Sequence, residues 1–265
     1  MSEFLLKKCI LFIRNDDELL RIIPTLREKL DLKFIVFTDI KFDKKKLKKN
    51  FNLSNTEILT HSEFEELIKN QKIETDYILS YYYQKKLKKE VLDIAKRGAI
   101  NIHPAPLPYY RGVGTYCLCI LDELDYWAST AHYMDEKIDN GRIIKVKKFK
   151  IEKEKETYFS LEKKTKINSK ILFEEVIQMI VEEKFEFEEC KVEKEKIKYL
   201  SLNKLKELKK INEEDDEKII KKKIRAFWCP PLMGAVIRLK DNEYTLINQD
   251  LLEIINEYQR EGVIK

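Results

Sequence analysis

Short apolar runs recur along the chain as far as residue 102, and segments with helical spacing separate them. The runs are four to eight residues long, as expected for buried strands. They lie at residues 9–13, 33–38, 56–60, 76–83 and 99–102. Apolar strands that alternate with helices of about ten residues are typical of a parallel sheet covered by helices. The pattern therefore predicts an α/β fold with a Rossmann-like parallel sheet.

Three helices are predicted between these strands. They lie at residues 16–30, 61–70 and 86–98. Pro24 should kink or restart the first helix, because proline interrupts the helical hydrogen bonds. Ser62 is the expected N-cap of the second helix, and Gly98 is the expected end of the third.

The rest of the chain mixes strands and helices less regularly. The predicted elements are a helix at 114–124, strands at 128–134 and 141–151, a long helix at 160–181, a β-hairpin around Asp241 and Asn242, and a helix at 249–262. The elements suggest a large α/β domain, residues 1–200, and a small α+β module, residues 201–265. The module would consist of a helix, the hairpin and a final helix.

Composition narrows the class of protein. Of the 265 residues, 43% are hydrophobic, which is enough for a core despite a charged fraction of 37%. The net charge of +5 is mild, and the two signs are interspersed as on a solvated surface. No glycine-rich phosphate turn follows the first strand, which argues against a dinucleotide-binding protein.

Cysteine usage and the N-terminus bear on metals and on the cellular compartment. The five cysteines are scattered without a C-x-x-C pair, and with only three histidines they give little support for a metal site. Scattered cysteines are typical of a reducing compartment. The first apolar run is too short for a signal peptide, and no run approaches the length of a membrane span. We therefore expect a cytoplasmic protein with no metal and no membrane partner.

The stretch GAINIHPAPLPYYRGVGT, residues 98–115, holds the first candidate chemistry. Its strand ends in Asn101-Ile-His103, and prolines at 104, 106 and 108 then force the chain out of regular structure. Residues two apart on a strand point to the same side, so Asn101 and His103 should share one face. In parallel sheets, ligands bind beyond the carboxyl ends of the strands, where these two side chains fall.

A second polar stretch, STAHYMDEKIDNG, supplies a partner for this histidine. Asp139 lies 36 residues beyond His103, in a turn that ends in glycine. A carboxylate commonly orients and stabilises a catalytic imidazolium, and an amide such as that of Asn101 can donate to a developing oxyanion. These three residues are the candidate catalytic set. His61 and His132 are interpreted as structural, since an isolated histidine more often packs within a fold.

NIHPAPLPYYRG followed by TAHYMDEKIDNGRII resembles the signature of the folate-dependent formyltransferase family. Its members formylate methionyl-tRNA, glycinamide ribonucleotide or nucleotide-linked amino sugars. The resemblance is close over residues 75–145, with one departure where HPAPLP replaces a common Ser-Leu pair. It implies N10-formyltetrahydrofolate as the formyl donor, and Asn101, His103 and Asp139 as the residues that catalyse transfer to an amine.

The resemblance also implies contacts for the two substrates. In the family, the segment before the Asn-containing strand surrounds the folate pterin, and here it is SYYYQKKL. The candidates are Tyr81, Tyr83, Gln84, Lys85 and Lys86, partly through backbone groups; alternatively, the tyrosines simply finish a strand. The candidates for the acceptor are Tyr109, Arg111 and Gly112, with Arg111 as a phosphate or carboxylate partner or, alternatively, a brace within its loop.

The C-terminal segment bears on the acceptor. IRAFWCPPLMGA, residues 224–235, resembles a crossover of the tRNA and amino-sugar members. Only 34 residues follow Pro231, too few for the β-barrel of the tRNA enzymes. We therefore expect formyl transfer to a dTDP- or GDP-linked amino sugar for surface polysaccharide. The expected assembly is a homodimer that uses the hairpin, with no nucleic acid partner.

Two alternatives stay open. A truncated methionyl-tRNA formyltransferase would bind tRNA in a salt-sensitive way through a basic stripe along residues 204–223, for which Lys204, Lys206, Lys209 and Lys210 are the candidates. A binding module without catalysis on the same fold would be favoured by the loss of a catalytic residue. Asn101, His103 and Asp139 are all present, which argues against it.

Overall fold

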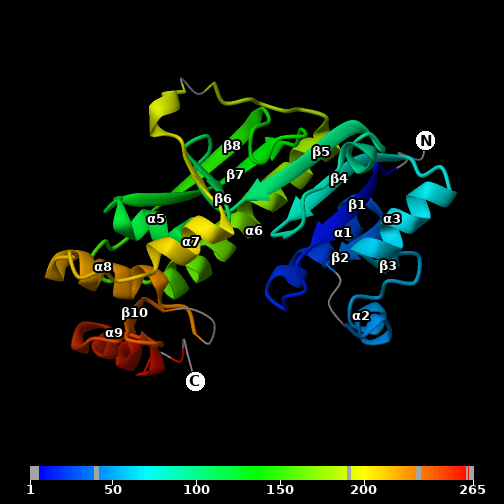
Figure 1. Ribbon diagram of the computed structural model, residues 1–265. Coiled ribbons are helices and arrows are strands. Elements are labelled where there is room, and N and C mark those ends of the chain that lie inside the picture. Colours follow the sequence, from blue (N-terminus) through cyan, green and yellow to red (C-terminus); the bar gives the residue numbers. More distant parts are fainter. Residues whose placement is uncertain (1–5, 39–41, 190–191, 231–233, 261, 263–265) are drawn as a thin grey trace. The chain divides into compact units, whose positions relative to one another are not determined.

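The computed structural model describes residues 6–38, 42–189, 192–230, 234–260 and 262 (Figure 1). The chain forms two compact units that interleave along the sequence. The first consists of Met1–Pro108, Ala128–Lys147 and Lys166–Glu193, and the second of Tyr109–Trp127, Lys148–Thr165 and Lys194–Lys265. The simpler division at residue 200 expected from the sequence stays a prediction.

A seven-stranded sheet provides the framework for the candidate residues (Figure 1). Its strands are β1 (Lys8–Ile13), β2 (Asp31–Phe37), β3 (Glu57–Thr60), β4 (Thr75–Tyr81), β5 (Ala95–His103), β7 (Tyr126–Tyr133) and β8 (Ile143–Lys150), in the order β3-β2-β1-β4-β5-β7-β8. Strands β1 to β5 pair in parallel, whereas β7 pairs with β5 in the antiparallel direction. The predicted α/β fold is confirmed, with a sheet that is mixed and mostly parallel.

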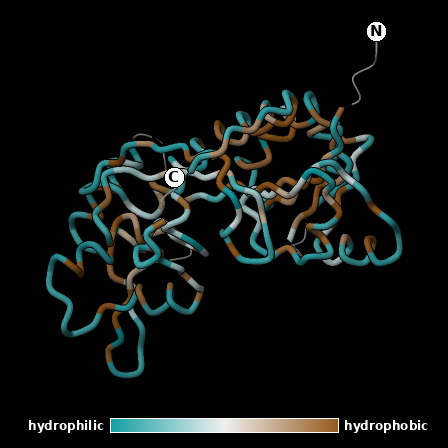
Figure 2. Tube along the Cα trace, turned by 90° about the horizontal axis from the view of Figure 1, so that it is seen from above, coloured by the Kyte–Doolittle hydropathy of each residue, from teal (hydrophilic) through white to brown (hydrophobic). Residues whose placement is uncertain are grey.

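Helices cover both faces of the sheet in the first unit, because its strands are apolar on both sides. On β1, Leu11 points into one core and its neighbour Phe12 into the other. The helices are α1 (Ile23–Lys29), α2 (Lys44–Asn50), α3 (His61–Asn70), α4 (Lys89–Leu92) and α6 (Tyr158–Glu182), with a 3-10 turn at Leu19–Ile22. Residues of α1 and of the second half of α6 join the first core, and residues of α3 and α4 join the second. Figure 2 shows hydrophobic stretches interspersed with hydrophilic ones along the trace, with the outer loops mostly hydrophilic.

The second unit has a core of its own. The helices are α5 (Tyr116–Leu121), α7 (Leu202–Leu208), α8 (Glu217–Phe227) and α9 (Gln249–Arg260), with a 3-10 turn at Lys194–Lys196. Short strands β6 (Tyr110–Gly112) and β9 (Lys198–Leu200) pair in parallel, and β10 (Val236–Leu239) and β11 (Asn242–Thr245) form a hairpin. The core contains Ile211, Ile224, Trp228, Ala235 and Leu251. The predicted hairpin and the helix after it are confirmed.

Local signals placed some helix ends correctly and others wrongly. Pro24 lies in the first turn of α1, so the helix restarts there as predicted. The N-cap of α3 is Thr60 rather than Ser62. The Thr60 hydroxyl accepts from the Glu63 backbone N–H at 3.2 Å, and a Glu63 carboxylate oxygen accepts from the Thr60 N–H at 2.7 Å. This reciprocal capping box starts the helix at His61, two residues earlier than an N-cap at Ser62 would.

The helix predicted at residues 86–98 is much shorter. Helix α4 covers only Lys89–Leu92, and β5 already begins at Ala95. Gly98 is therefore no helix cap: it lies within β5 with φ of +118°, opposite Tyr77 of β4. Pairing with β4 outweighs the local helical spacing here. Among the described helices, none is long and apolar enough to cross a membrane.

Gly98→Ala is expected to lower the free energy of unfolding by about 2 kcal/mol. A side chain is strained at this φ, and its Cβ would lie only 2.7 Å from the Tyr133 ring. Urea unfolding measures the change. Gly262→Ala is the matched control, since Gly262 also has a positive φ, +68°, but an added Cβ there meets nothing within 4 Å. Equal losses in both variants would show that contact with Tyr133 is not the cause.

Candidate active site

The pairing of β5 with β7 assembles the candidate site in the first unit. It sets Asn101 opposite His132 and His103 opposite Thr130. Directly opposed residues of an antiparallel pair point to the same face of the sheet. Ala99, two residues before Asn101, belongs to the core under α3 and α4, so this is the face that the site shares.

The structure brings the three predicted catalytic residues together around a fourth side chain. His103 Nδ1 lies 3.5 Å from Asp139 Oδ1, and Asn101 Nδ2 lies 3.2 Å from His132 Nε2. His132 Nε2 also lies 3.8 Å from Asp139 Oδ1. His103 is 4% exposed and His132 is 2% exposed, whereas Asn101 and Asp139 are partly exposed. The interpretation of His132 as merely structural is therefore incomplete, because it contacts Asn101 directly.

His132 has a defined protonation state. Its Nδ1 lies 2.8 Å from the Tyr133 carbonyl oxygen, which can only accept, so Nδ1 holds the hydrogen. Burial lowers the pKa of His132 more strongly than the nearby Asp139 carboxylate raises it, which keeps the ring neutral. Nε2 then has a lone pair and accepts from Asn101 Nδ2. This bond orients the Asn101 amide, and its second N–H hydrogen can serve a ligand oxygen.

The loop after β7 is braced so that it presents Asp139. Asp135 accepts from the Lys137 backbone N–H at 2.8 Å and from Asn140 Nδ2 at 3.0 Å. Asp139 itself has a positive φ of +51°. At the end of the loop, Gly141 approaches so closely that a Cβ would lie 1.8 Å from the Tyr133 carbonyl oxygen. Only glycine fits there, which explains the Gly-ended turn seen in the sequence.

The proline loop after His103 is fixed to β7 by one side chain. Thr130 Oγ1 donates to the Ala105 carbonyl oxygen at 2.7 Å and accepts from the Leu107 N–H at 3.0 Å. Thr130 is fully buried and lies opposite His103. The loop is thus held where the strand ends, and His103 has a fixed backbone on both sides.

The candidate folate residues fall in different surroundings. The Tyr81 side chain is buried under α6, where it stacks on Phe173 with ring centroids 4.8 Å apart. Its ring cannot reach a ligand, so any role for Tyr81 is limited to its backbone. Tyr83 lies on the α3 face, with its ring 5.2 Å from Phe12 and its hydroxyl 2.7 Å from His61 Nδ1. Gln84, Lys85 and Lys86 are exposed after it.

The candidate acceptor residues belong to the second unit. Tyr109 precedes β6, and Arg111 and Gly112 lie within it. All three are partly exposed. Gly112 has φ of +94°, and a Cβ there would lie 2.1 Å from the Leu200 carbonyl oxygen. The close pairing of β6 with β9 therefore accounts for a glycine at this position.

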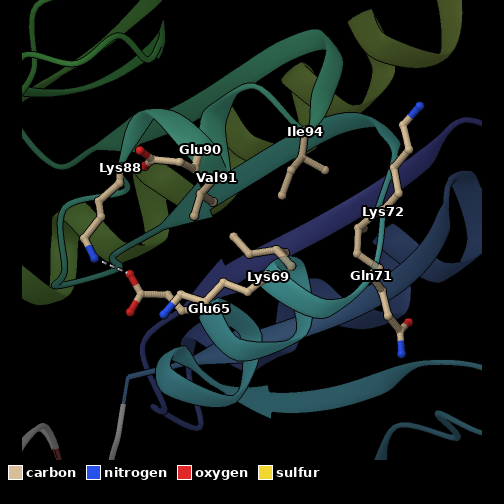
Figure 3. Close-up of a pocket in the computed structure, with 10 residues that line it drawn as sticks. Glu65, Lys69, Gln71, Lys72, Lys88, Glu90, Val91 and Ile94 are labelled. Atoms are coloured by element: carbon tan, nitrogen blue, oxygen red, sulfur yellow. Dashed lines mark hydrogen bonds and ion pairs between the residues drawn. The ribbon is translucent and has the colours of Figure 1, made fainter.

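A groove between α3 and α4 is separate from these side chains (Figure 3). Its volume is about 500 Å³. It is lined by Glu65, Ile68, Lys69, Gln71, Lys72, Ile73, Lys88, Glu90, Val91 and Ile94. Lys88 Nζ lies 2.7 Å from Glu65 Oε1 across the groove, so these two charged side chains of its lining pair with each other. None of the candidate site residues lines this groove. In the part of the chain that the structure describes, no three His, Cys, Asp or Glu side chains are arranged so that they could hold a metal ion.

Curated relatives match less than half of this chain. A bifunctional polymyxin resistance protein, ArnA, from Wigglesworthia glossinidia brevipalpis is 35% identical over 119 residues, 45% of this chain and 18% of that protein. A methionyl-tRNA formyltransferase from Caldicellulosiruptor saccharolyticus is 34% identical over 129 residues, 48% of this chain and 41% of that protein. A GDP-perosamine N-formyltransferase from Brucella melitensis is 33% identical over 102 residues, 38% of this chain and 39% of that protein. The chain thus matches less than half the length of these relatives.

Solved structures share the fold over most of the chain. A 4-N formyltransferase from Francisella tularensis has a TM-score of 0.72 at 21% identity, over 91% of this chain and 97% of that one. An N-formyltransferase from Helicobacter canadensis, solved with folinic acid and dTDP-3-aminofucose, has a TM-score of 0.65 at 21% identity, over 84% and 80%. The family model described as formyl transferase matches residues 27–177, more than half of the sequence. Since that match includes Asn101, His103 and Asp139, the chain belongs to the formyl transferase family.

Proposed function

We propose that this chain transfers the formyl group of N10-formyltetrahydrofolate to the amine of a nucleotide-linked amino sugar. The observation on which this depends is the cluster of the partly exposed Asn101 and Asp139 with the buried His103 and His132. It places an oriented amide donor beside a histidine with a carboxylate partner, as amine formylation requires.

The surroundings of the cluster support a folate as the donor. Leu87, Val91 and Ala99 are buried on the same face, and Tyr83 and Met134 pack against them. Ligand sites are lined mainly by apolar and aromatic side chains with a few polar groups, and the partly exposed Tyr83 and Met134 are the members of this set that could line one. The relative from Helicobacter canadensis was solved with folinic acid. When bound, N10-formyltetrahydrofolate would supply the formyl carbon that the amine attacks.

Asn101 would stabilise the charge that develops on the formyl oxygen. One N–H of the Asn101 amide donates a hydrogen bond to His132 Nε2, so the other N–H has a fixed direction. A preorganised donor of this kind contributes more than a mobile one, because nothing must reorganise during the reaction. His132 acts as a positioning residue in this scheme.

His103 would accept the proton that the attacking amine loses. Its Nδ1 faces Asp139 Oδ1 at 3.5 Å, which favours the tautomer with hydrogen on Nδ1 and makes Nε2 the basic nitrogen. Asp139 would then stabilise the imidazolium that forms. In the alternative role, His103 would donate a hydrogen bond to the oxyanion together with Asn101, and its side chain would lie where it does now.

The acceptor is proposed from the fold and from surface charge. Solved structures that share the fold over 91% of the chain include a sugar N-formyltransferase from Shewanella, whereas the curated relatives include both a methionyl-tRNA formyltransferase and a GDP-perosamine N-formyltransferase. RNA binding would need a stripe of unpaired cations along residues 204–223. Six lysines there have carboxylate partners: Lys209, Lys210, Lys218, Lys221, Lys222 and Lys223. This pairing weakens the tRNA alternative and favours the sugar nucleotide.

The homodimer expected from the sequence stays a proposal. The hairpin exposes Leu239 and Tyr244, and Ile247 follows it with half of its surface exposed. A second copy of the chain could cover these side chains, since small two-stranded units are rarely stable when exposed.

Incubation with N10-formyltetrahydrofolate and dTDP-, GDP- and UDP-linked amino sugars is expected to give a product heavier by one formyl group in place of hydrogen. Mass spectrometry detects it. The product should disappear with His103→Asn, which removes the base and keeps a polar side chain. Formylation of methionyl-tRNA and of no sugar nucleotide would contradict the proposed acceptor.

Asn101→Ala and His132→Leu are each expected to lower kcat by about 10²–10³ with little change in KM for the folate. If His132 acts through Asn101, the double variant should be no slower than Asn101→Ala alone. His132→Gln, which can still accept from Asn101, should recover part of the rate. Additive losses in the double variant would exclude this positioning role.

Nitrogen NMR is expected to show His132 as a neutral ring with hydrogen on Nδ1 from pH 5 to 8. Burial lowers the pKa of His132, so the ring becomes protonated only at a more acidic pH than an exposed histidine does. The three histidines can be assigned by comparing single variants. An imidazolium signal from His132 at pH 6 would contradict the assigned hydrogen bond from Asn101.

A further inference from the structure

The β6–β9 ladder of the second unit has two different faces. Its three residue pairs are Tyr110–Lys198, Arg111–Tyr199 and Gly112–Leu200. Paired residues of neighbouring strands point to the same side, and successive pairs alternate between the two sides. The first and third pairs therefore share one face, and Arg111 and Tyr199 share the other.

Contacts within the unit fix the first face. The Tyr110 hydroxyl donates to Asp122 at 2.9 Å, and Lys198 Nζ donates to both oxygens of the same carboxylate at 2.6 Å. The Tyr110 ring lies 5.2 Å from the ring of Trp127. Leu200 is buried, and its carbonyl oxygen accepts from the Val113 N–H at 2.9 Å. The ladder is thus a fixed base for whatever lies on the opposite face.

The second face presents an exposed ring beside a guanidinium. Tyr199 is 48% exposed, and Val113 and Leu202 next to the strands are also large exposed apolar residues. Arg111 is partly exposed. Aromatic rings on such surfaces stack on nucleobases, and a guanidinium binds two phosphate oxygens at once.

We propose that Tyr199 and Arg111 bind the nucleotide of the acceptor, with the Tyr199 ring stacked on the base and the Arg111 guanidinium paired with the diphosphate. This inference rests on the proposed function, since it presupposes a nucleotide-linked acceptor. One ring and one guanidinium match one nucleoside diphosphate. An RNA strand would need several cations along its backbone, and the adjacent Lys198 is already paired with Asp122.

The test is calorimetric titration of the full chain with dTDP, GDP and UDP. Tyr199→Ala is expected to weaken binding of the preferred nucleotide at least about tenfold, whereas Tyr199→Phe retains the ring and should stay within about twofold. Arg111→Ala should weaken binding of the nucleoside diphosphate more than binding of the free nucleoside. Tyr126→Ala is the matched control, because Tyr126 is a tyrosine of the same unit with 44% exposure.

The outcomes separate this inference from the proposed function. Equal nucleotide affinity in the unchanged chain and in Tyr199→Ala would overturn the role of the ladder and leave the sugar-nucleotide acceptor standing. Failure of the unchanged chain to bind any of the three nucleotides would contradict both the role of the ladder and the sugar-nucleotide acceptor. Weaker binding of methionyl-tRNA by Tyr199→Ala, without nucleotide binding, would assign the ring to RNA and overturn the inference.

Discussion

The antiparallel pairing of β7 with β5 is the constraint on which the candidate site depends. It sets Asn101 opposite His132, and two further backbone bonds extend the pairing toward the Asp139 loop, from Met134 N to Ala99 O and from Tyr133 N to Arg142 O. A shift by one residue would turn the whole row of β7 side chains to the other face. Register therefore determines the chemistry here, and the exact fit of Gly141 against Tyr133 helps to hold it.

The two histidines of the cluster have different partners. Burial keeps His132 neutral, which allows Nε2 to accept from Asn101. His103 is also buried, and its Nδ1 lies 3.5 Å from Asp139 Oδ1. Asp139 belongs to a loop whose own hydrogen bonds, from Lys137 and Asn140 to Asp135, fix its shape. One histidine is thus joined to an amide and the other faces a carboxylate, although they lie on adjacent strands.

The sequence predicted the parts of the site that depend on local rules. Period-two geometry and the proline loop located Asn101 and His103, and the Gly-ended turn located Asp139. His132 was interpreted from the sequence as structural, because its contact with Asn101 depends on strand register, which is a non-local property. The same limit applies to Tyr81 and Tyr83. Period two puts them on one face, but Tyr82 has a positive φ of +54°, and the two rings enter different cores. Strands β6 and β9 have only three residues each, too few to give an apolar pattern.

Family membership constrains the reaction more than the acceptor. In the proposed reaction, an attacking amine would make the same demands on Asn101, His103 and Asp139 whether it belongs to an amino acid or to a sugar. The relatives named for either acceptor are similarly close, at 34% and 33% identity. The family match ends at residue 177, before β9 begins. Residues that the match does not cover can therefore contribute to the proposed choice of acceptor. Tyr199 is one of these, and it pairs with Arg111, which the match does include. In the proposed scheme, the ladder thus pairs a strand inside the family match with a strand outside it.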